Sequence, residues 1–108
     1  MKNTNTLKLK YYGKTFNLIA YKETYARDDS LAITLIDKKE GEPFSCLTVN
    51  VMESFFLEPN QAYVDINNNP WALDFIEQNK LGKFIGRYAH SGYCTYPLFE
   101  FDLSKLAV

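Results

Sequence analysis

The sequence predicts an α+β domain in which a mainly antiparallel sheet of five to seven strands carries one helix, over about residues 70–80, on one face. Three observations predict it. Several short segments alternate apolar and polar residues with a period of two, turn residues separate them, and one segment has the spacing of an amphipathic helix. The 108 residues fit one core, so residues 1–108 are expected to form a single globular domain.

The first two strands are predicted by alternation around a glycine. Apolar or aromatic and polar positions alternate in Leu7, Lys8, Leu9, Lys10 and Tyr11, as in a strand with one wet face. Gly13 interrupts this run and residues 16–21 resume it. We therefore expect Tyr12-Gly13-Lys14 to be a tight hairpin connection.

Two further strands are expected over residues 31–36 and 44–51. Arg27-Asp28-Asp29-Ser30 precedes the first of them, and Asp28-Asp29 is interpreted as a turn in preference to a ligand pair. Residues 38–43, rich in charge, Gly and Pro, form the intervening loop. The first half of the chain is therefore predicted to be an antiparallel meander.

The middle of the chain is less regular. Residues 53–57 are too short and too mixed to assign, whereas Glu58-Pro59-Asn60 is a turn signal. Residues 61–66 are predicted to form another short strand.

The helix is predicted from Asn67-Asn68-Asn69-Pro70-Trp71, with Asn69 as N-cap and Pro70 at the first helical position. Trp71, Ala72, Phe75 and Ile76 form one apolar stripe that is expected to pack on the sheet. The helix is expected to end near Asn79 and Lys80, with Gly82 as terminator.

A final hairpin is predicted from residues 84–90 and 93–102, joined by Ser91-Gly92. Pro97 lacks a backbone donor, so its strand is expected to lie at an edge or to bend there.

Composition limits the function classes. A net charge of −1 provides no overall field toward nucleic acid or an anionic membrane. Residues 1–6 show no secretory signal, and no run approaches the roughly 20 apolar residues of a membrane span, so a cytoplasmic location is expected. In that reducing compartment Cys46 and Cys94 are predicted to be buried free thiols.

Catalytic and metal-binding signatures are weak. His90 and Cys94 are the best pair, because a thiol beside an imidazole can become an activated nucleophile. The pair matches no local protease signature, and a metal would need further ligands, from Cys46 or carboxylates. Residues 82–87 contain two glycines and two cations but no phosphate-binding pattern. We therefore expect no catalytic residue, metal or cofactor, and keep a small cysteine enzyme as the least favoured alternative.

The first hairpin offers a nucleic-acid alternative. It carries Lys8, Lys10, Lys14 and Lys22 with Tyr11, Tyr12 and Tyr21. Cations and rings on one sheet face can hold single-stranded nucleic acid, but lysines also protect exposed strand edges from pairing. The net charge of −1 favours edge protection.

A second cluster belongs to the last hairpin. Tyr and Arg are enriched at protein interfaces, and the hairpin concentrates Arg87, Tyr88, His90, Tyr93 and Tyr96. These five are the predicted partner-binding residues. The alternative is that they are ordinary residues of the protein core and its margin.

Four motifs spread over nearly the whole chain form a specific set: Leu9-Lys10-Tyr11-Tyr12-Gly13-Lys14; Gly41-Glu42-Pro43-Phe44 with Leu47-Thr48-Val49-Asn50; Asp65-Ile66-Asn67-Asn68-Asn69-Pro70-Trp71; and Ser91-Gly92-Tyr93-Cys94-Thr95-Tyr96-Pro97-Leu98. Together they resemble an uncharacterised family of small proteins of Firmicutes and Bacteroidetes, often encoded on phages, plasmids and conjugative elements. The resemblance implies an accessory or counter-defence role, including inhibition of a CRISPR nuclease or restriction enzyme by direct contact. It brings no catalytic residues.

The expected function is therefore that of a non-enzymatic accessory protein of a mobile element, which binds a host protein such as a defence nuclease. A nucleic-acid-binding accessory protein is the first alternative.

Overall fold

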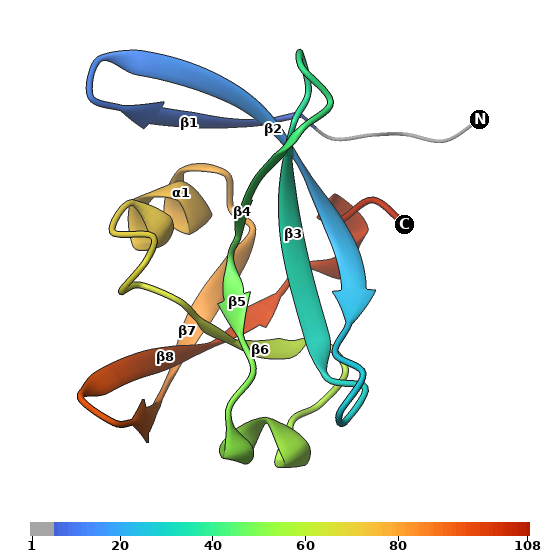
Figure 1. The fold of residues 1–108 in the computed structure, drawn as a ribbon, viewed down its shortest axis with the longest axis vertical. Helices are drawn as coiled ribbons and strands as arrows, with labels where there is room; N and C mark the ends of the chain where they lie inside the picture. The colour runs from blue at the N-terminus through green and yellow to red at the C-terminus, as the bar shows by residue number, and fades with distance from the viewer. Residues whose placement is uncertain (1–5) are drawn as a thin grey trace.

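The computed structural model describes residues 6–108, so the polar stretch at residues 1–5 lies outside the described residues (Figure 1). The strands are β1 (Leu7–Tyr11), β2 (Lys14–Thr24), β3 (Leu31–Asp37), β4 (Pro43–Cys46), β5 (Thr48–Val49), β6 (Gln61–Val64), β7 (Gly82–Ser91) and β8 (Cys94–Phe101). The helix α1 (Ala72–Gln78) and two short 3-10 helices, η1 (Met52–Phe56) and η2 (Leu103–Lys105), complete the described elements.

The strands form two antiparallel sheets, ordered β1-β2-β3-β4 and β5-β6-β8-β7. The predicted α+β class, antiparallel pairing and single helix are confirmed. The sequence led us to expect five to seven strands, whereas residues 6–108 form eight, because the strand expected at residues 44–51 is two strands in different sheets.

Leu47 is the point at which the chain changes sheets. Its N–H donates to the Ile33 carbonyl of β3 (2.9 Å), whereas its own carbonyl accepts from the Asp65 N–H (3.0 Å) just after β6. The fully buried Leu47 side chain packs in the core. The apolar positions change phase at the same place, from Phe44 and Cys46 to Leu47, Val49 and Val51.

The main core lies between the two sheets and is closed by α1, which Figure 1 shows between the β1–β2 hairpin and the β7–β8 hairpin. Trp71, Phe75 and Ile76 are buried, as the stripe predicted. The Trp71 ring lies 5.7 Å from Phe44 of β4, and the Asn79 side chain binds both backbone polar groups of Lys8 in β1. None of the helices within residues 6–108 has the length and apolar character to cross a membrane.

The predicted end of the helix near Asn79 and Lys80 is confirmed, since Asn79 is the C-cap of α1. Its start is corrected: Trp71 is the N-cap and Ala72 the first helical residue, so Pro70 lies before the helix. Asn69 is not the N-cap: its buried amide accepts from the Ser45 hydroxyl (2.6 Å) and donates to the Cys46 carbonyl (2.8 Å), so it ties the helix entry to β4. Gly82 is not the terminator, because Lys80 adopts the left-handed conformation (φ 51°). Gly82 instead begins β7, where an added Cβ would lie 2.7 Å from the Glu100 carbonyl oxygen of β8.

The last hairpin forms as predicted, with Tyr88 opposite Pro97 and Ser91 opposite Cys94. Because β8 lies between β6 and β7, Pro97 is not on an edge strand. Next to Pro97, the register of β7 and β8 shifts between Phe84 and Tyr88, because residues 85–87 of β7 lie opposite Leu98 alone.

Candidate functional site: an aromatic ledge

Three large apolar side chains project into solvent from η1. The exposed fractions are 73% for Met52, 61% for Phe55 and 85% for Phe56. We call these three residues the aromatic ledge. The two phenylalanine rings lie side by side with centroids 6.4 Å apart. Adjacent exposed residues of this size commonly mark an interaction site.

The ledge projects because a 3-10 helix has three residues per turn. Val51, Ser54 and Leu57 recur at that spacing; Val51 and Ser54 are buried and Leu57 is partly buried. Val51 and Leu57 pack in a second apolar cluster with Tyr63, Ala89 and Leu98. The Ser54 hydroxyl accepts from the Val51 N–H (3.1 Å), and the Ser54 N–H donates to the Val51 carbonyl (2.9 Å). With this side of the turn inward, the ledge residues point outward.

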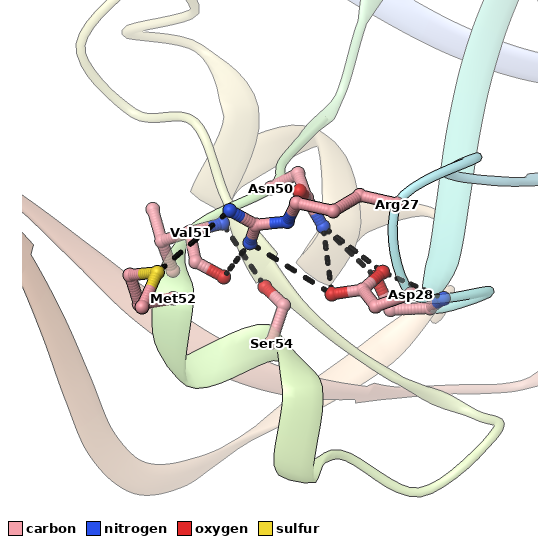
Figure 2. A network of polar contacts seen from close by, with 7 residues as sticks. Arg27, Asp28, Asn50, Val51, Met52 and Ser54 are labelled. Atoms are coloured by element: carbon pink, nitrogen blue, oxygen red, sulfur yellow. Dashed lines mark hydrogen bonds and ion pairs between the residues drawn. The ribbon is translucent and has the colours of Figure 1, made fainter.

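A polar network fixes the start of η1 to the loop between β2 and β3, as Figure 2 shows. The Arg27 guanidinium donates to the Val51 carbonyl (2.7 Å) and contacts the Met52 sulfur (3.8 Å). It also lies 3.8 Å from the Asp28 carboxylate, whose side chain is fully buried. The Asn50 amide donates to both Asp28 carboxylate oxygens (3.3 and 3.2 Å). Two neighbouring loop residues therefore hold the backbone that carries the ledge.

The Asp28 carboxylate is the centre of this network. Burial opposes its ionisation, but the hydrogen bonds from the Ser30 hydroxyl and N–H (2.7 and 3.0 Å) act in the other direction. With Asn50 and Arg27 adding to them, the pKa of Asp28 is lowered below its ordinary value. The carboxylate is therefore charged at neutral pH and holds its partners in place.

The ledge is acidic at its margins. Residues 50–60 contain Glu53 and Glu58 and no Lys or Arg, and both carboxylates are on exposed residues. Arg27, which supports the ledge, is paired with Asp28. Such a surface can insert rings into an apolar cavity while its carboxylates meet cations at the cavity rim. Phosphate groups would be repelled.

The predicted partner-binding residues do not form one surface. Register places Tyr88 and His90 on one face of the β7–β8 hairpin and Tyr96 on the other, since alternate residues of a strand face opposite sides. Burial raises the pKa of Tyr63, and Arg87, which lies close to the Tyr63 hydroxyl, acts on this pKa in the opposite direction. Arg87 and Tyr96 therefore share the sheet face against which η1 packs. Tyr93, in the turn, is fully exposed.

His90 and Cys94 lie on opposite faces of the hairpin, because His90 pairs with Thr95 and Cys94 with Ser91. His90 Nδ1 is 3.2 Å from the Thr95 hydroxyl. A hydrogen bond with Cys94, assisted by burial, raises the pKa of Tyr96. The arrangement does not provide the thiol–imidazole pair that a cysteine enzyme needs.

Both cysteines are free, but Cys46 is exposed and Cys94 partly buried, so their predicted burial is wrong. At Cys46 the change of sheets puts Leu47 into the core instead. Within residues 6–108, no group of three His, Cys, Asp or Glu side chains is placed to hold a metal ion.

The lysines of the first hairpin also divide between two faces. Lys8 and Lys10 point away from the side on which Leu7 and Leu9 are buried. Lys14 pairs with Tyr11, and Lys22 with the buried Ile33, so both lie on the opposite face from Lys8 and Lys10. No continuous cationic face results.

Sequence reasoning missed the ledge because residues 53–57 fit neither a strand nor an α-helix. The available signal is the spacing of three that joins Val51, Ser54 and Leu57, which leaves two consecutive phenylalanines outside the apolar side.

Comparison with known proteins identifies the family of this chain. A family model described as a domain of unknown function (DUF4313) matches residues 17–108, which include η1, its supporting network and the β7–β8 hairpin. No curated protein and no solved structure matches the chain. The expected membership of an uncharacterised family is thereby confirmed.

Proposed function

We propose that this protein, which belongs to the DUF4313 family of domains of unknown function, is a non-enzymatic protein that binds and blocks a host protein through its aromatic ledge. The observation that carries the proposal is the exposure of Met52, Phe55 and Phe56 on a segment that two loop residues hold in place. Exposed rings are costly to keep in water, and a partner cavity removes that cost.

Rigidity of the ledge favours tight binding. The contacts of Arg27 with Val51 and Met52 are present before any partner arrives, so little backbone freedom is lost on binding. Large aromatic anchors of this kind supply most of the binding energy in many interfaces. Arg87 and Tyr96, on the adjoining sheet face, extend the contact surface.

The acidic margin favours a partner with a basic rim. Nucleases hold the phosphates of their substrates with Lys and Arg, so their substrate clefts have the charge that Glu53 and Glu58 complement. The resemblance to proteins of phages, plasmids and conjugative elements supports the same choice. We therefore propose a counter-defence inhibitor that acts in the host cytoplasm on a restriction or CRISPR nuclease.

The test is inhibition of purified restriction enzymes and RNA-guided nucleases by the parent protein and by Phe56→Ser. We expect the parent to bind one nuclease and stop DNA cleavage. Phe56→Ser should bind it about 30-fold more weakly, as expected for loss of an anchor worth about 2 kcal/mol.

The control is Tyr93→Ser, which removes another exposed ring, from the turn between β7 and β8. It should inhibit like the parent. If Phe56→Ser inhibits as well as the parent at unchanged thermal stability, the ledge is not the binding site. If the parent binds no nuclease of the panel, the proposed target class is excluded.

A further inference from the structure

A groove of about 890 Å³ lies between α1 and the β7–β8 hairpin. Its volume is within the range of about 300–1,000 Å³ typical of small-molecule sites. Leu73 and Ile76 of α1 form one wall, and Phe84, Tyr88 and Phe99 of the hairpin form the other side. Because Tyr88 is on the sheet face opposite Tyr96, the groove and the ledge are separate sites.

Rings dominate the hairpin side of the groove. Phe84 lies 5.9 Å from Phe99 and 5.2 Å from Tyr88, centroid to centroid. The bulge in β7 brings Phe84 and Tyr88 together, and Gly86 makes it possible by adopting φ 85°. Phe84 and Tyr88 are about half exposed, whereas Phe99 is buried beneath them. Open ring faces are therefore available to a ligand.

The charged residues of the groove sum to −1, from two lysines and three carboxylates. Lys83 and Glu100 form an ion pair (3.7 Å). Glu77, in α1, and Lys80, two residues beyond its end, lie on the helix side of the groove. The remaining carboxylate is that of Asp102.

The Asp102 carboxylate remains anionic in its setting. It accepts hydrogen bonds from the Ser104 hydroxyl (2.6 Å) and N–H (3.0 Å), which lower its pKa. The nearby Lys105 ammonium, which donates to the Asn79 carbonyl (3.0 Å), also lowers the pKa of Asp102. The lining of the groove, with a net charge of −1, thus joins an anionic carboxylate to several ring faces, and both attract a weakly hydrated cation.

We propose that this groove binds an organic monocation with an apolar body, such as a quaternary or aromatic ammonium compound. The rings would contact its apolar body and its charge together, and Asp102 would provide the counter-charge. This site does not depend on the proposed function of the ledge.

Three soluble probes that share a benzyl group test the charge preference: benzyltrimethylammonium, benzyl alcohol and phenylmethanesulfonate. Titrations of the full-length protein followed by amide chemical shifts should give saturable binding at residues of α1, β7 and β8. We expect the cation to bind at least tenfold more tightly than the sulfonate, with the alcohol between them. Equal affinities, or tighter binding of the sulfonate, would overturn the proposal.

Variants then separate the rings from the charge. Tyr88→Ala should weaken the binding of all three probes, because it removes a ring from the groove. Asp102→Asn keeps an oxygen acceptor for Ser104 and should reduce only the preference for the cation. Phe56→Ser, on the ledge, should leave all three affinities unchanged.

Two results of the variant series would contradict the proposal. Cation binding that Tyr88→Ala leaves unchanged would place the site elsewhere. A fall in molecular mass from dimer to monomer in Tyr88→Ala, measured by sedimentation, would show that a second copy of the chain occupies the groove instead.

Discussion

Single buried polar side chains join distant segments of this protein. Asp28 connects the loop after β2 to the residues before η1, and Asn69 connects the start of α1 to β4. Each is fully satisfied by hydrogen bonds, which is the condition for a buried polar group to stabilise a fold. Their role is to fix one segment against another that lies more than 20 residues away.

Asp28→Asn should destabilise the protein. The new amide nitrogen is itself a hydrogen-bond donor, and it would face donors of Ser30, Asn50 or Arg27. We expect a loss of about 1–3 kcal/mol in the free energy of unfolding between about pH 5 and 8, measured by urea denaturation. The control is Asp29→Asn, which changes the same residue type at an exposed neighbouring position.

The pH dependence of this loss has a definite sign. The folded pKa of Asp28 lies below its ordinary value of 3.8, so its stabilising contribution is present above that value and disappears as the pH falls through the folded pKa. The parent and Asp28→Asn should therefore converge in stability in acid. A difference that persists there would mean that the charge of Asp28 is not responsible.

At the scale of elements, α1 is short but occupies the space between two sheets. Trp71, next to its first residue, lies against Phe44 of β4 (5.7 Å) and Phe75 of α1 (5.8 Å), and Phe44 in turn contacts Phe16 of β2 (5.1 Å). These four rings connect the helix to the first sheet. The position of α1, and with it one wall of the groove, depends on this packing.

Trp71→Ala should cost about 3–5 kcal/mol, enough to unfold many domains of this size. The matched control is Leu73→Ala on the same helix, whose side chain is 44% exposed and should cost much less. Circular dichroism during thermal denaturation measures both. Equal stability of the parent and Trp71→Ala would contradict the assigned packing.

At the scale of the whole molecule, the C-terminus joins the two sheets. After β8 and η2, Ala107 pairs in parallel with Tyr21: its N–H donates to the Ala20 carbonyl and its carbonyl accepts from the Lys22 N–H, both at 2.7 Å. Leu106 and Ala107 are buried. The last residues thus add to the edge of β2 beyond the end of β1.

Deletion of residues 106–108 should lower the free energy of unfolding by about 2–4 kcal/mol, because it exposes apolar surface and leaves two β2 backbone groups without their partners. Deletion of Val108 alone, whose side chain is largely exposed, is the control and should have a small effect. Urea denaturation compares them. If both deletions are equally mild, the tail does not hold the sheets together.

Local sequence patterns determined the elements of this protein. Alternation marked most of the strands, Gly13 and Gly92 lie in the turns of the β1–β2 and β7–β8 hairpins, and the spacing of Trp71, Phe75 and Ile76 identified the buried side of α1. These features depend on residues close together in the chain, so their physical cause is visible in the sequence. The error at residues 44–51 came from interpreting two alternating segments as one strand, although the apolar positions change phase between Cys46 and Leu47. The alternation does not reveal that the two segments pair with different strands.

Tertiary structure decided how these elements combine. Leu47 divides one apolar run between two sheets, and the β7–β8 register sends the predicted binding residues to opposite faces, because pairing partners are chosen by contacts far apart in the chain. The ledge is determined in the same way. Phe55 and Phe56 would be ordinary core residues by composition, and they are exposed because Val51, Ser54 and the distant Arg27 and Asp28 fix the opposite side of η1 inward.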